Sequence, residues 1–242
     1  MRHRFYTPIK QRKLISAMWA VVPSKQFGAA KKRLAALLSE AERVALAEVM
    51  LRDVLAALHT SGAVEGIVVV SKEPAVQRLA QEYAAHYLPE TDSDLSLAVV
   101  QGGAFVKERG ADTMLMVPGD VPLLCATDIQ ELVGHHLPGR TLTLVSDREG
   151  TGTNGLVVSP IDLIEFSYGI NSFSAHRDAG NAANAQVLSI ELEGLSLDID
   201  TPEDVRTLMA YDRASATFDY LDEINVVSRL PHRHNVRYSV FA

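Results

Sequence analysis

The feature that most constrains the fold is the run Ile67–Val70, four consecutive β-branched residues with no polar residue between them. β-branched side chains favour extended backbone, and a strand without polar alternation has to be covered on both faces. Apolar runs at Ser16–Val22 and Thr113–Val117 are separated from it by segments with helical spacing. This alternation predicts an α/β fold, with a mainly parallel sheet covered by helices on both faces.

Composition narrows the classes of function. With 47% hydrophobic and 22% charged residues, the 242-residue chain can bury a substantial core. The net charge of −7 argues against a nucleic-acid partner, which usually requires a basic patch. Cys125 is the single cysteine, which excludes a disulfide framework or a Cys-rich zinc site and indicates a reducing, cytoplasmic location. No apolar stretch approaches the roughly 18 residues of a membrane span.

The two ends of the chain differ from its middle. Residues 1–15 form a basic leader whose following apolar run is too short for an export signal, so we expect it to be flexible. Residues 16–211 carry the strand and helix pattern and are predicted to form a single domain. Residues 212–242 have weak periodicity and end in a basic segment, which predicts a polar tail. Such a tail would be ordered only by a partner chain, and the partner we expect is a second copy in a homodimer.

Two local helix signals are clear along the chain. Ser39 with Glu42 predicts a capping box that opens a long amphipathic helix. Thr127 with Gln130 predicts a second capping box, whose helix runs to His135 and His136. Adjacent histidines point to different faces of a helix, so we interpret them as cations at the helix end rather than as a metal pair.

A cation-rich loop follows the first predicted strand. It contains Lys25, Lys31 and Arg33 among small residues, a combination that phosphate-binding loops use. The Gly-Lys-Ser/Thr ending of a P-loop is absent. Two interpretations stay open: a phosphate-binding loop and an exposed loop with several cations.

Acidic residues follow two other predicted strands. Asp120 comes after the strand Thr113–Val117, at a Pro-Gly turn, where it either holds a metal and a nucleotide phosphate or only shapes the turn. Asp198 and Asp200 share one face of an extended segment and repel each other unless a cation or basic partner lies between them. Together these carboxylates predict an oxygen-rich Mg²⁺ site. Such a site favours phosphoryl or nucleotidyl transfer without identifying the nucleotide.

The segment Asp147–Asn154 is rich in glycine and threonine. Backbone N–H groups freed by glycine, together with hydroxyls, suit an oxyanion or phosphate ligand. Its eight residues exceed the two to five typical of a hairpin turn, which favours a functional loop.

Five segments in order resemble one enzyme family. The segment from Val22 to Leu34 is similar to the opening signature of the phospholactate guanylyltransferases of coenzyme F-420 biosynthesis. Four later segments resemble the family's later motifs: Gly119–Pro122, Asp147–Thr153, Gly169–Ser172 and Leu197–Pro202. Each motif alone is weak, but five in sequence over residues 18–210 are specific.

The resemblance implies a glycosyltransferase-A-like nucleotidyltransferase (Rossmann-like) fold and transfer of GMP from GTP to a small phosphorylated carboxylic acid, with release of pyrophosphate. That acid is 2-phospho-L-lactate, phosphoenolpyruvate or 3-phospho-D-glycerate, depending on the member. The residues carried over comprise Asp120 and Asp198 with Asp200 nearby for Mg²⁺, Thr153, Gly169 and Ser172 for the acid, and Lys25, Lys31 and Arg33 for the GTP phosphates.

Ser96 departs from the family pattern, which usually has Asn at this position. Two other functions remain as alternatives. The segment Asp198-Ile199-Asp200 superficially matches the Asp-x-Asp motif of sugar-nucleotide glycosyltransferases, although that motif usually follows a central strand. A non-catalytic nucleotide-binding scaffold is the other alternative.

Overall fold

The structure is a computed structural model that describes residues 17–27 and 31–231. The predicted leader, residues 1–15, therefore lies outside the described residues. Within the described part of the chain, no helix combines the length and the apolar character needed to cross a membrane.

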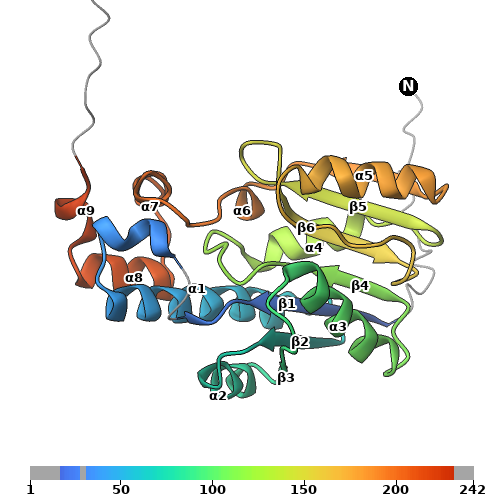
Figure 1. Cartoon of the computed structure of the whole chain (residues 1–242), viewed down its shortest axis with the longest axis horizontal. Coiled ribbons are helices and arrows are strands. Elements are labelled where there is room, and N and C mark those ends of the chain that lie inside the picture. Colours follow the sequence, from blue (N-terminus) through green and yellow to red (C-terminus); the bar gives the residue numbers. More distant parts are fainter. Residues whose placement is uncertain (1–16, 28–30, 232–242) are drawn as a thin grey trace, which may run out of the picture.

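One seven-stranded sheet organises the molecule (Figure 1). Its strands follow in the spatial order β3 (His86–Pro89), β2 (Gly66–Ser71), β1 (Met18–Ser24), β4 (Thr113–Met116), β6 (Thr153–Ser159), β5 (Thr141–Ser146) and β7 (Gln186–Ile190). All neighbouring pairs are parallel except those that β6 makes with β4 and β5. The predicted α/β fold with a mainly parallel sheet is confirmed. The one strand that runs against its neighbours is β6, which forms a hairpin with β5.

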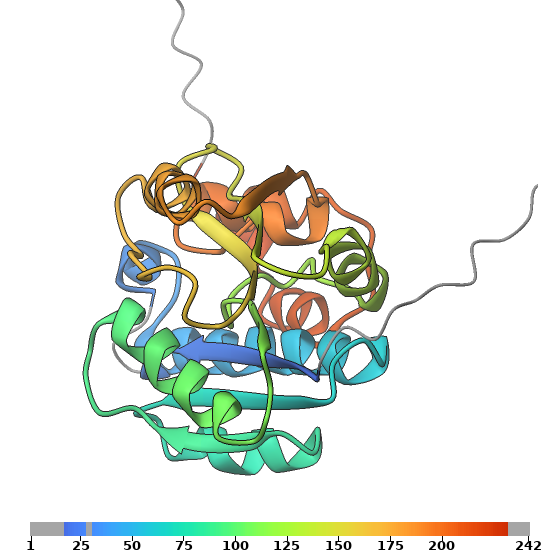
Figure 2. The ribbon, with the colours of Figure 1, turned by 90° about the vertical axis from the view of Figure 1, so that its right-hand side faces the viewer.

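The helices follow the strands in the chain. They are α1 (Glu40–Ser61), α2 (Ala75–Glu82), α3 (Leu95–Lys107), α4 (Ala126–His135), α5 (Ser172–Ala182), α6 (Glu193–Ser196), α7 (Pro202–Leu208), α8 (Ala216–Glu223) and α9 (Val226–Arg229), with a short 3-10 helix η2 (Lys32–Ala36). In Figure 2, most of the blue-to-green part of the chain surrounds one edge of the sheet, and the yellow and orange part surrounds the other edge.

Both faces of the sheet are covered, as the apolar runs require. Ala20 and Val22 of β1 belong to a cluster shared with α1, α2 and α4, whereas Val21 belongs to a cluster shared with α3. Alternate residues of one strand therefore enter opposite cores. This is the physical reason why β1 and β2 contain no polar alternation.

The predicted helix starts were right at α1 and wrong at α4. Ser39 and Glu42 form the expected capping box of α1. At α4 the box is instead Cys125 with Asp128, whose carboxylate accepts from the Cys125 N–H at 2.8 Å. Thr127 lies inside the first turn, so its hydroxyl is not placed to cap it.

The prediction of a polar tail after Tyr211 is wrong for the residues described there. Helix α8 packs on α1 and α9 packs on α8, and together they bury Phe218, Leu221 and Val226 in a third apolar cluster. Asp53 of α1 caps α8, because its carboxylate accepts from Ser215 Oγ and from the N–H groups of Ala216 and Thr217. No pattern in the sequence pairs a residue of α1 with a helix start more than 160 positions away.

Candidate active site

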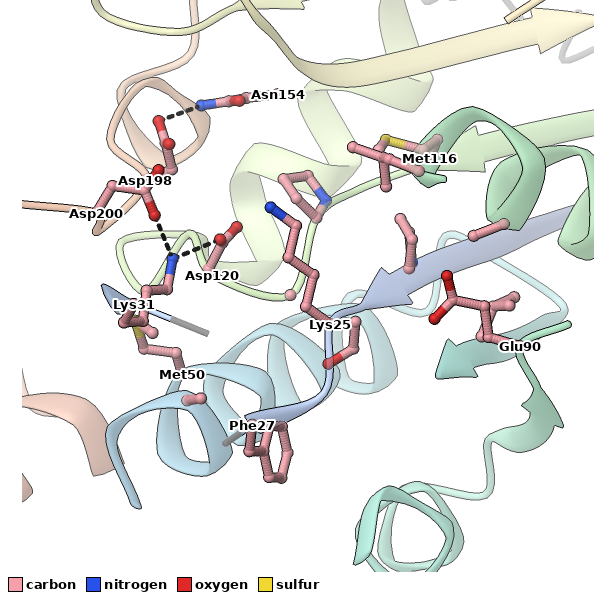
Figure 3. Close-up of a pocket in the computed structure, with 18 of the residues that line it drawn as sticks. Lys25, Phe27, Lys31, Met50, Glu90, Met116, Asp120, Asn154, Asp198 and Asp200 are labelled. Atoms are coloured by element: carbon pink, nitrogen blue, oxygen red, sulfur yellow. Dashed lines mark hydrogen bonds and ion pairs between the residues drawn. The ribbon is translucent and has the colours of Figure 1, made fainter. Parts of the chain in front are cut away.

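A pocket opens where the carboxyl ends of β1 and β4 meet the beginning of β6 (Figure 3). Because β6 is antiparallel to β4, its first residues lie at the edge where the parallel strands end. This is the edge at which open α/β sheets bind ligands. The pocket is lined by residues from every cluster predicted at strand ends, including Lys25, Lys31, Asp120, Thr153, Asn154, Asp198 and Asp200.

One side of the pocket, called here the acidic wall, consists of Asp120, Asp198 and Asp200 around Lys31. The Lys31 ammonium donates to Asp120 Oδ2 at 2.6 Å and to Asp200 Oδ1 at 2.9 Å (Figure 3). Lys31 adopts the left-handed conformation, with φ of 56°, and its side chain is only 5% exposed. The cation-rich loop thus supplies a basic partner for Asp200, but the lysine bridges to Asp120 and not to Asp198, the neighbour for which the sequence predicted it.

Electrostatics agree with this arrangement. Burial alone would lower the pKa of Lys31, but the charges of Asp120 and Asp200 outweigh it and leave the pKa raised. Burial likewise works to raise the pKa of Asp200, and Lys31, aided by Lys25, holds it below its ordinary value. The lysine is therefore charged and the Asp200 carboxylate ionised at neutral pH.

Asp198 has a different environment. Its Oδ1 accepts from Asn154 Nδ2 at 3.2 Å, and the N–H of Ile199 donates to the carbonyl of Asp120 at 3.2 Å, which joins the two acidic segments. Burial raises the pKa of Asp198, and the charge of Asp120 raises it further. Of the three carboxylates, Asp198 is the one without an ion pair among the described residues.

The donor set suits a hard divalent cation. Among the described residues, no group of three or more His, Cys, Asp and Glu side chains forms a complete metal site. Mg²⁺, however, commonly takes only one or two protein carboxylates and completes its shell with water and substrate phosphates. Asp198 has no ion pair among the described residues and its segment is joined to that of Asp120, so the chemistry of these two carboxylates fits the ion.

A second part of the pocket, called here the hydroxyl wall, is formed by Thr153 together with Ser172 and His176, which contact Thr153 from behind. Thr153 donates its backbone N–H to Ser172 Oγ, and its own Oγ1 lies 3.0 Å from Nδ1 of His176. All three residues are buried, and only Thr153 lines the pocket. Asn154, the next residue along β6, links this wall to the acidic one through Asp198.

The Asp147–Asn154 segment does not present the free N–H groups that its composition predicted. Asp147 accepts from the N–H groups of Thr151 and Gly152 with its own carboxylate, at 2.8 Å each. A Cβ at position 152 would lie 2.5 Å from Asp147 Oδ2, which explains the glycine. The glycines here close a β5–β6 hairpin instead of holding an anion.

The remaining predicted residues are more dispersed. Arg33 lines a neighbouring hollow together with Arg148 and Asp204. Asp198 and Asp200 line both this hollow and the pocket. Gly169 is exposed, has a φ of +131° and accepts from the N–H of Ser172 with its carbonyl. Ser96 accepts from the backbone N–H of Tyr168 at 2.9 Å, so it positions the loop before α5.

Sequence reasoning missed three residues around the pocket. Asn154 was included only as the end of a loop, although it directly follows Thr153. Glu90 lines the side of the pocket away from the aspartates in Figure 3. His176 was noted only as part of a helix, and its position four residues after Ser172 on the same helix face was the available signal.

His136 was interpreted as a helix-end cation, but it is buried and burial lowers its pKa to about 4, so it is neutral.

A family model described as guanylyl transferase CofC like matches residues 18–242. The chain belongs to this family. A phosphoenolpyruvate guanylyltransferase of Conexibacter woesei is 37% identical over 203 residues, covering 82% of this chain and 91% of that protein. A 2-phospho-L-lactate guanylyltransferase of Methanosphaera stadtmanae is 27% identical, covering 85% and 90%.

Membership confirms the resemblance drawn from the five motifs and makes this chain a nucleotidyltransferase of the guanylyltransferase kind. A solved nucleotidyl transferase from Methanothermobacter has the same fold, with a TM-score of 0.60 at 16% identity over 86% of this chain and 99% of that one. The alternatives of a glycosyltransferase and of a non-catalytic scaffold are set aside.

Proposed function

We propose that this guanylyltransferase transfers GMP from GTP to a small phosphorylated carboxylic acid, and that the pocket between the two walls is its active site. The observation that carries the proposal is the meeting of Asp120, Asp198 and Asp200 with Lys31 and Thr153 in one pocket. Acidic and basic side chains that adjoin a buried hydroxyl suit two anionic substrates that have to approach each other.

Mg²⁺ is part of this proposal, held by Asp120 and Asp198 with Asp200 nearby. When bound, the ion would neutralise the charge of the GTP phosphates and polarise the α-phosphate. Lys25 lines the pocket and its charge helps to lower the pKa of Asp200, so its ammonium would be within reach of phosphate oxygens there. Arg33 would reach the same phosphates only from the neighbouring hollow.

The bond changes need no general base from the protein. A phosphate oxygen of the acid, already ionised, attacks the α-phosphorus of GTP, and the bond between that phosphorus and the bridging oxygen of the β-phosphate breaks. Pyrophosphate leaves with the bonding electrons. The chain orients both phosphates and balances the negative charge that builds on the leaving group, which is where Lys31 and Lys25 contribute.

The acid belongs beside the hydroxyl wall, because Thr153 offers a neutral donor next to the metal-binding carboxylates. Ser172 supports Thr153 from behind, and Gly169 supports Ser172. The relative that shares 37% identity favours phosphoenolpyruvate, with 2-phospho-L-lactate and 3-phospho-D-glycerate as the other acids to test.

Guanine fits the side of the pocket that carries Glu90. Its N1–H and 2-amino groups are donors that a carboxylate accepts, whereas adenine offers no such pair. Burial raises the pKa of Glu90, and the Lys72 charge and backbone N–H counteract this rise. Leu95 and Ala98 of α3 also line the pocket and would provide apolar contacts for the base.

The test is a competition among the three acids with GTP and Mg²⁺. We expect release of pyrophosphate and a guanylylated product whose mass identifies the acid. Chelation of Mg²⁺ should stop the reaction, and ATP should replace GTP poorly. If GTP released no pyrophosphate with any of the three acids, the proposal would be contradicted.

A homodimer and a cytoplasmic location remain parts of the proposal. Removal of residues after Pro231 is the suitable test of the dimer, because truncation after Tyr211 would also remove Phe218 and Leu221 from the core. A dimer held by the end of the chain should become a monomer in light scattering.

A further inference from the structure

A buried imidazole stands directly behind the pocket. His176 is 0% exposed on α5, and its two ring nitrogens each have a partner: Nδ1 lies 3.0 Å from Thr153 Oγ1, and Nε2 accepts from the Ser167 backbone N–H at 3.0 Å. Tyr168 packs edge-on against the ring, with ring centroids 4.7 Å apart. The imidazole does not line the pocket, so any effect on a ligand passes through Thr153.

The partner at Nε2 decides which nitrogen of His176 carries the proton. A backbone N–H can only donate, so Nε2 has to accept and bears no hydrogen. Burial lowers the pKa of His176 to about 4, so the ring is neutral at physiological pH and its one proton is on Nδ1. Nδ1–H therefore donates to Thr153 Oγ1.

This assignment fixes the role of the Thr153 hydroxyl. Its oxygen receives the Nδ1–H bond, while its own proton has no other acceptor among the described residues. Thr153 lines the pocket and the adjoining Asn154 contacts Asp198, so an anion in the pocket is the acceptor within reach. A neutral hydroxyl that already accepts one hydrogen bond is a better donor in the next.

We propose that His176 is a positioning residue that acts through Thr153, turning its hydroxyl into a hydrogen-bond donor for the acceptor acid. The inference rests on the proposed function, since it assigns the acid to the hydroxyl wall. The Ser172 hydroxyl accepts from the Thr153 N–H, so backbone and side chain of Thr153 are held by two residues of one helix. Ser167 extends the same support to the loop before α5.

The chain contains a matched control at the other end of β6. His136 is also buried, with Nδ1 3.0 Å from Thr143 Oγ1 and Nε2 2.9 Å from Ser159 Oγ. Ser159 donates its hydroxyl proton to the Gly139 carbonyl at 2.6 Å, so it accepts from Nε2–H and leaves Nδ1 to accept from Thr143. Here the Thr143 hydroxyl donates its proton to Nδ1 of His136, and Thr143 does not line the pocket.

The experiment is a double-mutant cycle on the full-length enzyme with steady-state kinetics in both substrates. Thr153→Val and His176→Phe should each raise the KM for the acid about tenfold, the size of one hydrogen bond to a charged group, with the KM for GTP unchanged. The double variant should be no worse than Thr153→Val alone, because the histidine acts through the hydroxyl. Thr153→Ser, which keeps the hydroxyl, and His176→Asn, which keeps a donor near the Nδ1 position, should restore most of the affinity.

The control pair Thr143→Val and His136→Phe should lower the melting temperature and leave both KM values unchanged. Additive effects of Thr153→Val and His176→Phe, or an unchanged KM for the acid in both His176 variants, would overturn the inference. KM does not depend on the fraction of folded enzyme, so partial unfolding cannot imitate the expected result. Absence of turnover in the wild-type enzyme would contradict the proposed function instead.

Discussion

The acidic wall and the hydroxyl wall border the same pocket, but their side chains are held in place by different interactions. Lys31, Asp120 and Asp200 are held by ion pairs between turns, and the two carboxylates remain 31% and 47% exposed. The hydroxyl wall is neutral, fully buried and tied to a strand and a helix by directional hydrogen bonds. The acidic wall can therefore exchange partners when a cation arrives, whereas the hydroxyl wall is already in the geometry that it presents to a ligand.

The largest effect is expected from breaking the acidic wall at Asp120. Asp120→Asn keeps the shape of the side chain and removes its charge, so turnover should fall roughly 1000-fold, as for loss of a main electrostatic contact. Asp162→Asn, at an exposed carboxylate paired with Lys107 at 2.6 Å, is the control and should retain activity. Pyrophosphate release measures both. Activity near that of the wild type would show that Asp120 holds no metal.

Lys31 sharpens the comparison, because in the proposed site it would compete with Mg²⁺ for Asp120. Lys31→Met should lower turnover about 100-fold, since a buried charge near the phosphates is lost. It should also leave Asp120 and Asp200 uncompensated, so Mg²⁺ should raise the melting temperature of the variant more than that of the wild type. Lys107→Met is the control. An equal Mg²⁺ effect in both proteins would argue against metal binding at these acids.

Glu90 tests whether the pocket contains a second, separate role for a carboxylate. Glu90→Gln replaces one acceptor oxygen by a donor, so the KM for GTP should rise about tenfold through the loss of a charged hydrogen bond. The preference for GTP over ITP, which lacks the 2-amino group, should shrink while the KM for the acid stays constant. Glu82→Gln, at a surface carboxylate paired with Arg52, is the control. Unchanged discrimination between GTP and ITP would remove Glu90 from base recognition.

The last prediction concerns stability against pH rather than activity, and it rests on the neutral histidines. Burial lowers the pKa of His136 and of His176 to about 4 from 6.5, so below pH 6.5 the unfolded chain binds protons that the folded chain does not. Stability is complete above pH 6.5 and should fall by up to about 3 kcal/mol per histidine as the pH approaches 4. His136→Gln should remove about half of this loss. Urea denaturation between pH 7 and pH 4 measures it, and an equally steep decline in the variant would contradict the assignment.

Much of the fold could be predicted from local patterns. Ile67–Val70 became β2, buried on both faces, and the Ser39 box opened α1, because apolar periodicity and capping act over a few residues. The ends of β1 and β4 were placed at the ligand edge for the same reason. The fold of residues 216–230 was not predictable, since its cap, Asp53, lies on α1 and its apolar partners lie on α1 and on other elements distant in the sequence.

The candidate site divides in the same way. By itself, the sequence determined which charged groups follow which strands, and hence that Asp120, Asp198 and the lysines would gather at one edge. Only the tertiary structure decided their partners: that Lys31 bridges Asp120 and Asp200, and that His176 contacts Thr153 across 23 positions. The difference has a physical cause. Where a strand ends is set by turn residues close by in the chain, whereas the partner of a buried charge or ring nitrogen is whichever group the packed elements bring within about 3 Å of it.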